Sequence, residues 1–568
     1  MPLFAQAEET NVPGGAWLSR LAAAVVVCAL LLGAAIAFFH LGFETNDDVA
    51  MLKLAAGLYD GRPSQYLILI NVALGLLLKS LYQHVSHVPW YEILLLTVHF
   101  LSLSLLLFTL FLRRFSWRTL LLFVSFFLTF ELVILCRMSY TTTAFVAAMS
   151  GILLMVAACS MEKPFPGMVF AVAGGCLLVL AGMVRLYSLW LALLLSIPFL
   201  LAVERRLRLR VWITIGLATV ASFGFMKYSH HLHRQAGWAD YLEQDHYRWR
   251  LQDTPRLAIT EETRPHFDEA GWAEHEIALF RYFLYDDRVF SPAVMKRLSE
   301  RLVTRRSLHD AMGAVGDALA VHKITFLLAA VLAGLVLLLA ERRARWIMIL
   351  TAGWSLVVFL GLVYAAKPPF RVVHSLIVFD AAVAIFLLCF SGGLRQTPGL
   401  RRWTVAAIIA LLAAGTLVQS FRMLRESERN RIRGQMFAEL AVALSRLQPD
   451  AVIVPYGGTY PLPLFVDLDK LKSPRSIPGG WLINSPIYHT LKRNLGVAEV
   501  HEALLRREHC YLLVDQRMDD HLREHLPPFF KRHYGAAISF ETVGRAGDCI
   551  LYRLVSRDTG ASRPVENP

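Results

Sequence analysis

Residues 21–39 read LAAAVVVCALLLGAAIAFF, a run without a charged side chain. As a helix this run is about 28 Å long, close to the roughly 30 Å hydrocarbon core of a bilayer. It is too long for a secretory signal and lacks a basic leader, so we expect an uncleaved first span. Similar runs recur along the 568 residues, of which 56% are hydrophobic. The sequence therefore excludes a soluble globular protein and predicts a polytopic membrane protein.

The apolar runs predict an all-α bundle with about eleven transmembrane helices. The expected spans are 17–40, 91–112, 119–136, 143–160, 167–184, 188–203, 211–227, 323–340, 346–364, 373–390 and 403–420. A further apolar stretch, 66–82, is ambiguous. If it crossed, the basic loop 113–118 and the basic loop 204–210 would face opposite sides. We therefore expect 66–82 to lie along the membrane surface.

The net charge of +13 is concentrated in short loops between the apolar runs. This pattern is typical of cytoplasmic loops in a bacterial plasma membrane and does not indicate a nucleic-acid partner. The amino terminus is then cytoplasmic, and three large segments are external: 41–90, 228–322 and the tail from 421 onward. The weakest point is 167–203, because merging its two short spans would reverse the orientation of everything upstream.

The tail, 421–568, is expected to form a small external α/β domain, separate from the transmembrane domain 1–420. A helical stretch, 424–447, is followed by four short runs typical of strands. These runs are Ala451–Tyr456, Cys510–Asp515, Ile538–Val543 and Cys549–Val555. Cys510 and Cys549 each open a run, and they form either a disulfide or two buried thiols.

The first external loop begins Phe43-Glu44-Thr45-Asn46-Asp47-Asp48. Its acidic pair suits the first turn of a helix, where carboxylates face the positive end of the dipole. That helix, with Val49 and Leu52 on one face, is expected to lie at the membrane surface. Adjacent carboxylates beside a span also suit glycosyl transfer from a lipid phosphate. This reaction needs a base for the acceptor and charge balance for the departing phosphate.

The first span, the acidic pair, two juxtamembrane helices and the distal domain together resemble the GT-C superfamily. Protein O-mannosyltransferases and lipid A aminoarabinose transferases are among its members. The resemblance implies an inverting, multi-pass glycosyltransferase that uses a polyprenyl-phosphate sugar donor. It assigns the catalytic base to Asp47, while Asp48 positions the acceptor or binds a divalent cation, and the sequence leaves the metal requirement open. Some members follow the acids with Lys/His-Pro-Pro, whereas this chain has Arg62-Pro63-Ser64, so the sugar stays open.

A donor phosphate needs cations at the external face, and short external turns supply four candidates. They are Arg137, Arg185, Lys367 and Arg371. Arginine suits this task because its planar fork donates two parallel hydrogen bonds. Each could instead serve as an interfacial anchor or an ion-pair partner, for example with Glu131 or Asp380, which lie in predicted spans.

Two other features are read as structural. His230, His231 and His233 follow a span without a carboxylate partner, and Asp286-Asp287 is expected at the surface. The functional prediction is transfer of a sugar to a glycan, lipid or protein acceptor of the cell envelope. A transporter or flippase of lipid-linked glycans and a non-catalytic assembly protein are the alternatives. Basic tail residues (Arg506, Arg507, Lys531 and Arg532) suit the last of these. Convergence of the acidic pair and the cationic turns at one cavity would favour the enzyme.

Overall fold

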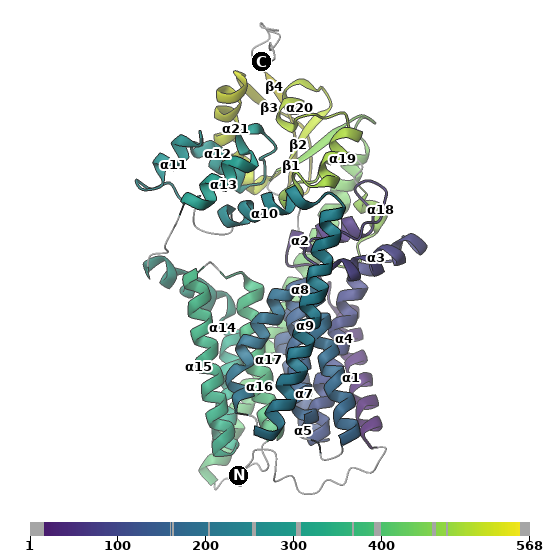
Figure 1. The fold of residues 1–568 in the computed structure, drawn as a ribbon, viewed down its shortest axis with the longest axis vertical. Coiled ribbons are helices and arrows are strands. Elements are labelled where there is room, and N and C mark those ends of the chain that lie inside the picture. The colour runs from purple at the N-terminus through teal and green to yellow at the C-terminus, as the bar shows by residue number, and fades with distance from the viewer. Residues whose placement is uncertain are drawn as a thin grey trace.

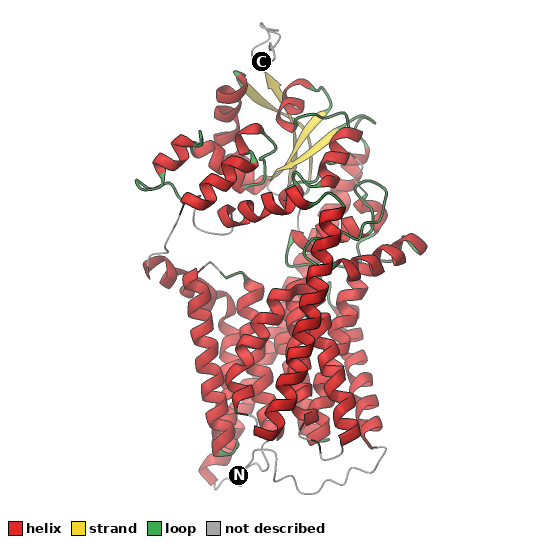
Figure 2. Cartoon of the chain, viewed as in Figure 1, coloured by secondary structure: helices red, strands yellow, loops and turns green. Residues whose placement is uncertain are grey.

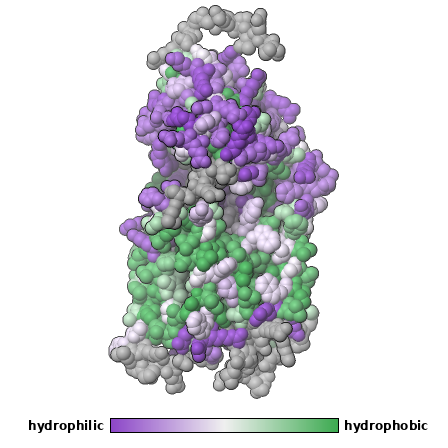
Figure 3. All heavy atoms as spheres, turned by 60° about the vertical axis from the view of Figure 1, so that its left-hand side comes forward, coloured by the Kyte–Doolittle hydropathy of each residue, from purple (hydrophilic) through white to green (hydrophobic). Residues whose placement is uncertain are grey.

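The computed structural model describes residues 16–159, 161, 164–202, 205–252, 257–302, 308–365, 368–390, 399–456, 462–472 and 475–556. It has two layers, a bundle of long helices and a mixed domain stacked on one end of that bundle (Figure 1). All the strands lie in the mixed domain (Figure 2). The bundle's surface forms an apolar band beneath a hydrophilic domain (Figure 3). The chain is thus a multi-pass membrane protein with a soluble domain on one side.

Ten helical stretches of the described chain are long and apolar enough to cross a membrane. They lie in α1 (Ala16–Phe38), α4 (Trp90–Arg113), α5 (Trp117–Phe126) with η1 (Phe127–Glu131) and α6 (Leu132–Cys136), α7 (Tyr140–Cys159), α8 (Pro164–Leu201), α9 (Arg205–Gln235), α14 (Leu308–Leu339), α15 (Arg342–Ala365), α16 (Phe370–Phe390) and α17 (Gly399–Ser445). Their bounds agree with the predicted spans to within a few residues, except where helices continue beyond the membrane.

The difference between eleven predicted spans and ten helices lies in α8, which contains both 167–184 and 188–203. Its backbone is non-helical at Arg185, with φ −158° and ψ 105°. The helix reverses there. Gly167 lies against Ala158 at one end of α7, whereas Ser188 bonds Thr141 at the other end. The second half of α8, after Arg185, runs back to the end of the bundle where α8 began. There the carbonyl of Ala202 accepts a hydrogen bond from the guanidinium of Arg343, at the start of α15. The chain therefore passes twice through the bundle within α8.

Two short helices follow α1 at the junction of the bundle and the domain. The helix α2 (Asn46–Ala55) is buried along nearly its whole length, from Asp48 to Ala55. The prediction of an amphipathic surface helix was therefore wrong for α2, because the domain covers the face that was expected to meet water. The helix α3 (Val72–His84) has 13 residues and is too short to cross. It projects sideways at the junction, as expected for 66–82 (Figure 1).

The carboxyl-terminal domain contains a four-stranded sheet in the order β1-β2-β4-β3. Its strands are β1 (Val452–Tyr456), β2 (Cys510–Asp515), β3 (Ile538–Ala546) and β4 (Cys549–Ser556), which confirms the four predicted runs. Strands β1 and β2 pair in parallel, and β4 is antiparallel to both of its neighbours. The helices are α18 (Leu468–Leu471), η4 (Gly480–Leu482), α19 (Pro486–Asn494), α20 (Val500–Arg506), η5 (Gln516–Met518) and α21 (Asp519–Tyr534).

The large loop after α9 packs into the same core as the sheet. Its helices are α10 (Ala239–Gln252), α11 (Arg264–Glu269), α12 (Glu274–Arg281), η3 (Arg288–Phe290) and α13 (Pro292–Arg301). The pair Asp286-Asp287 joins the two parts. Asp286 accepts from Lys492 at 2.7 Å, and Asp287 accepts from the hydroxyl of Tyr534. This pair was expected at the surface, but it is largely buried because it satisfies donors from the sheet domain.

The two cysteines of the tail are free and buried. Asp515 pairs with Cys549 in the antiparallel register, so Cys510 lies at the opposite end of the two strands. Five strand residues span about 17 Å, far beyond the reach of a disulfide. Of the two alternatives, the structure has the buried thiols.

The topology predicts opposite accessibility for two exposed basic positions. We expect Lys531→Cys, on α21, to react with a membrane-impermeant maleimide in intact spheroplasts, because the basic loops at the opposite end of the bundle predict an external domain. Arg118→Cys, at the other end of the bundle, should react only after permeabilisation. Wild type supplies the background. Labelling of Arg118→Cys in intact spheroplasts would overturn the orientation.

Candidate functional site

An extended segment, Leu41–Glu44, holds the acidic loop between the bundle and the domain. Its backbone bonds Met138 on one side, through Glu44 N to Met138 O at 2.8 Å and Met138 N to Gly42 O at 2.7 Å. On the other side Phe43 N donates to Leu462 O at 2.9 Å. Because three parts of the chain meet in this ladder, the position of the acidic pair depends on the docked domain.

Asn430, on α17, anchors the start of the same segment. Its side-chain amide donates to the carbonyls of His40 and Cys136 at 2.9 and 3.0 Å. Ser427, one turn earlier, accepts from the backbone N–H of His40. The last span thereby ties the end of α1 to the turn after α6. Asn430 and Cys136 are buried, so their polar groups would otherwise lack partners away from water.

Asp48 is fully buried and bound by three donors. One carboxylate oxygen accepts from the hydroxyl of Tyr91 at 2.8 Å and from the backbone N–H of Tyr140, the first residue of α7, at 3.1 Å. The other accepts from Thr45 at 3.3 Å. Burial raises the pKa of Asp48 to about 7 although these donors oppose the rise. This side chain fixes α2 to α4 and α7.

Asp47 differs from its neighbour because its side chain is accessible and close to Arg371. The distance between Asp47 Oδ2 and Arg371 Nη2 is 3.9 Å, and the two side chains are 22% and 20% exposed. Glu44 lies on the other edge of the same guanidinium, at 4.0 Å. Both distances exceed a hydrogen bond, so neither carboxylate occupies the donors of the fork, and within the described residues these donors stay available to a ligand.

Glu44 is a site residue that sequence analysis missed. It accepts from the backbone N–H of Arg371 at 3.3 Å, in the first turn of α16. Its second oxygen is buried without a hydrogen-bond partner among the described residues. Burial raises the pKa of Glu44 to about 7, against the charge of Arg371. Its position next to the acidic pair was the only signal in the sequence.

Arg185, at the point where α8 reverses direction, also lies near the acidic pair. Its guanidinium lies over the ring of Tyr140, 5.2 Å from the centroid, and over that of Tyr187 at 5.1 Å. Tyr140 is in electrostatic contact with Arg185, Asp47 and Arg371. Two of the predicted phosphate-binding arginines therefore converge on the acidic pair.

Arg137 is adjacent but engaged elsewhere. It pairs with Glu426 of α17 at 3.0 Å and lies over the ring of Phe370 at 4.8 Å. Its charge still acts on Glu44. The suggested partners form other contacts, since Glu131 pairs with His99 at 2.6 Å and Asp380 accepts from Ser355. Lys367, the fourth candidate, lies outside the described residues.

Within the described ranges, no group of three or more His, Cys, Asp or Glu side chains could hold a metal ion. A divalent cation at Asp48 stays a prediction. In the histidine cluster, His233 Nδ1 contacts the carbonyl of Ser229, and its ring packs edge-on against Tyr66 and Trp238. Among the basic tail residues, Arg507 donates to backbone carbonyls and Arg532 contacts Glu276.

The fold and site together define a multi-pass membrane protein with a charged site where the bundle meets a soluble domain. No family model and no curated protein matches the sequence. Among solved structures, apo ArnT from Cupriavidus metallidurans is 12% identical, with TM-score 0.40, over 94% of this chain and 98% of that chain. ArnT from the same organism bound to undecaprenyl phosphate is 13% identical, with TM-score 0.36, over 95% and 98%.

The raised pKa of Glu44 predicts a pH-dependent stability difference. The folded protein holds this proton up to about pH 7, whereas the ordinary pKa is 4.5. The stabilisation from the retained proton is present below pH 4.5 and lost as pH rises through 7, a change of about 3 kcal/mol. Glu44→Gln cannot ionise, so its melting temperature should rise relative to wild type between pH 5 and 8. Exposed Glu274→Gln is the control, and a pH-independent difference for Glu44→Gln would contradict this account.

Proposed function

We propose that the chain is a membrane glycosyltransferase that moves a sugar from a polyprenyl-phosphate donor to a cell-envelope acceptor. The observation that carries the proposal is the convergence of Asp47, Glu44 and Arg371 at the domain-side end of the bundle. These side chains come from the first loop and the start of α16, which are far apart in the sequence. An accessible carboxylate beside an arginine with free donors suits a reaction that needs both a base and a phosphate ligand.

In this proposal Asp47 accepts the proton of an acceptor hydroxyl. The hydroxyl oxygen then attacks the anomeric carbon of the donor sugar from the face opposite the phosphate. As the new glycosidic bond forms, the bond between the anomeric carbon and the phosphate oxygen breaks. The phosphate leaves with the electron pair, so the configuration at the anomeric carbon inverts.

Arg371 is proposed to bind the leaving phosphate, and Arg185 adds positive charge from the other side of Tyr140. Two cations offset the charge that builds on the phosphate oxygen as the bond breaks. Glu44, with a pKa of about 7, is only partly ionised near neutral pH and so offsets less of the Arg371 charge than an ionised carboxylate would. Asp48 is proposed to hold α2 in place through Tyr91 and Tyr140, which keeps Asp47 aimed at the acceptor.

The proposed side of the membrane follows from charge. Basic residues of the 113–118 loop and the start of α15 lie at the end of the bundle opposite the domain. By the positive-inside rule that end is cytoplasmic, so the site and the domain are external in a bacterial plasma membrane. A transporter would instead need charged groups along a path to the cytoplasmic end. Two buried acids lie within the spans, Glu131 near a domain-side end and Asp380 midway along α16, and each is bound to a neighbouring side chain.

Replacing the proposed base tests the reaction directly. Asp47→Asn keeps the size of the side chain and its suitability for a first turn. It removes the basicity, so transfer turnover should fall by about 10²–10⁴-fold while expression and thermal stability stay near wild type. Asp240→Asn, exposed on α10, is the matched control. Wild-type transfer by a well-folded Asp47→Asn protein would remove Asp47 from the reaction.

Arg371→Lys separates charge from geometry at the phosphate. The backbone N–H that donates to Glu44 is unchanged, and the positive charge remains. The planar fork is lost, so binding of a polyprenyl phosphate should weaken by about tenfold or more. Equilibrium binding in detergent, with Arg288→Lys on the exposed domain surface as control, measures this. Equal affinities for Arg371→Lys and wild type would contradict the assignment.

A further inference from the structure

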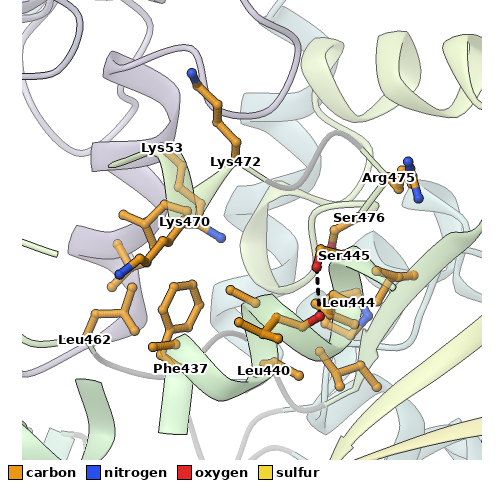
Figure 4. A pocket seen from close by; sticks show the side chains of 18 of the residues that line it. Lys53, Phe437, Leu440, Leu444, Ser445, Leu462, Lys470, Lys472, Arg475 and Ser476 are labelled. Atoms are coloured by element: carbon orange, nitrogen blue, oxygen red, sulfur yellow. Dashed lines mark hydrogen bonds between the residues drawn. The ribbon is translucent and has the colours of Figure 1, made fainter. Parts of the chain in front are cut away.

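A cavity of about 530 Å³ lies between α2, the extension of α17 and the carboxyl-terminal domain. Its size is within the range of pockets that bind small molecules. Apolar side chains of α17 line one side, including Phe437, Leu440 and Leu444. In Figure 4, Lys53 and Lys470 lie on one side of this space, and Ser445 and Arg475 on the other. The cavity is on a different face of α2 from Asp48, which points toward Tyr91 and Tyr140.

Lys53 is the unusual group in this cavity. Its side chain comes from α2 and is only 9% exposed. It has no hydrogen bond or ion pair within the part of the chain that the structure describes, and its ammonium lies over the ring of Tyr59, 5.8 Å from the centroid. Burial lowers the pKa of Lys53 to about 8. A buried ammonium without an anion is costly, so the position is suited to a negatively charged ligand.

The rim of the cavity adds further positive charge. Lys470, Lys472 and Arg475 line it, with Asp469 as the one acidic residue among the lining side chains. Asp469 is paired with Lys472 at 2.6 Å. Arg475 donates to the carbonyl of Gln448 at 2.8 Å and still presents its charge. The field in the cavity is therefore positive, which matches an anion.

The apolar side chains of α17 that line the cavity indicate which kind of molecule carries the anionic group. Phe437 and Leu440 offer flat apolar surface against which the ring of a sugar can pack, while lysine binds phosphate as a point charge. Val49 and Lys53 lie on one face of α2, and Lys53 is about 9 Å along the helix from Asp47. Asp47 is not among the residues that line the cavity, so a saccharide anchored at Lys53 has to extend around α2 to reach the proposed base.

We propose that this cavity is an acceptor subsite that binds a phosphate-bearing saccharide, with the phosphate on Lys53 and the sugar ring against Phe437. The assignment as an acceptor subsite rests on the proposed function, whereas the binding itself does not. The occupant is the headgroup of the acceptor. Free inorganic phosphate has the anion but no sugar ring, and a neutral sugar has the ring but no anion.

The test is binding to the full chain in detergent without any donor, measured by calorimetry. The probes are glucose 1-phosphate, glucose and inorganic phosphate. Wild type should bind glucose 1-phosphate more tightly than either of the others. Lys53→Met should weaken that binding by about tenfold or more, the worth of a charge-assisted hydrogen bond. Lys531→Met, on the exposed face of α21, is the matched control and should bind as wild type does.

Phe437→Ala provides a second variant that leaves the buried charge in place. It should weaken glucose 1-phosphate binding and leave inorganic phosphate unaffected. Equal affinity of Lys53→Met and wild type would overturn the phosphate assignment, and inorganic phosphate that binds as tightly as glucose 1-phosphate would overturn the saccharide. Because no transfer is measured, failure here leaves Asp47 untouched, and failure of the Asp47 test leaves this binding site in place.

Discussion

The extended segment Leu41–Glu44 is the constraint on which the rest of the site depends. It lies between the turn at Met138 and the domain loop at Leu462, with hydrogen bonds to both. Asn430 holds its beginning against α17. The segment delivers Glu44 and the acidic pair to the start of α16. A bundle without its docked domain would lose one edge of this ladder, so bundle and domain form the site together.

The acidic side chains of the first loop differ in role: Asp48 and Glu44 make structural hydrogen bonds, and Asp47 has the proposed chemical role. Asp48 and Glu44 each accept a backbone N–H at the start of a span, from α7 and α16 respectively. First-turn amides lack partners within their own helix, and a carboxylate suits the positive end of the dipole. Asp47 makes no such bond and faces Arg371. The pair read from the sequence as one motif therefore contains a structural member, Asp48, and a member that the proposed function makes reactive, Asp47.

Local sequence patterns were enough to predict the helices and strands, but not the contacts between side chains that are distant in the sequence. Apolar length predicted the spans, including both halves of α8, and alternating short runs predicted all four strands. The closeness of Asp47 and Arg371 followed from placing both at the external ends of spans. Glu44 and Lys53 could not be identified, because their burial depends on a domain that is distant in the sequence. The amphipathic pattern of α2 led to the wrong prediction of a surface helix for the same reason.

The central claim is that a lipid phosphate binds beside the accessible carboxylate Asp47. The most direct measurement is an experimental structure of the full chain in lipid nanodiscs with a polyprenyl phosphate. We expect the phosphate within hydrogen-bonding distance of the Arg371 guanidinium, near Arg185, with the chain between the spans and Asp47 facing it. A phosphate bound at another place, or none at saturating lipid with the Asp47, Glu44 and Arg371 side chains arranged as here, would contradict the account.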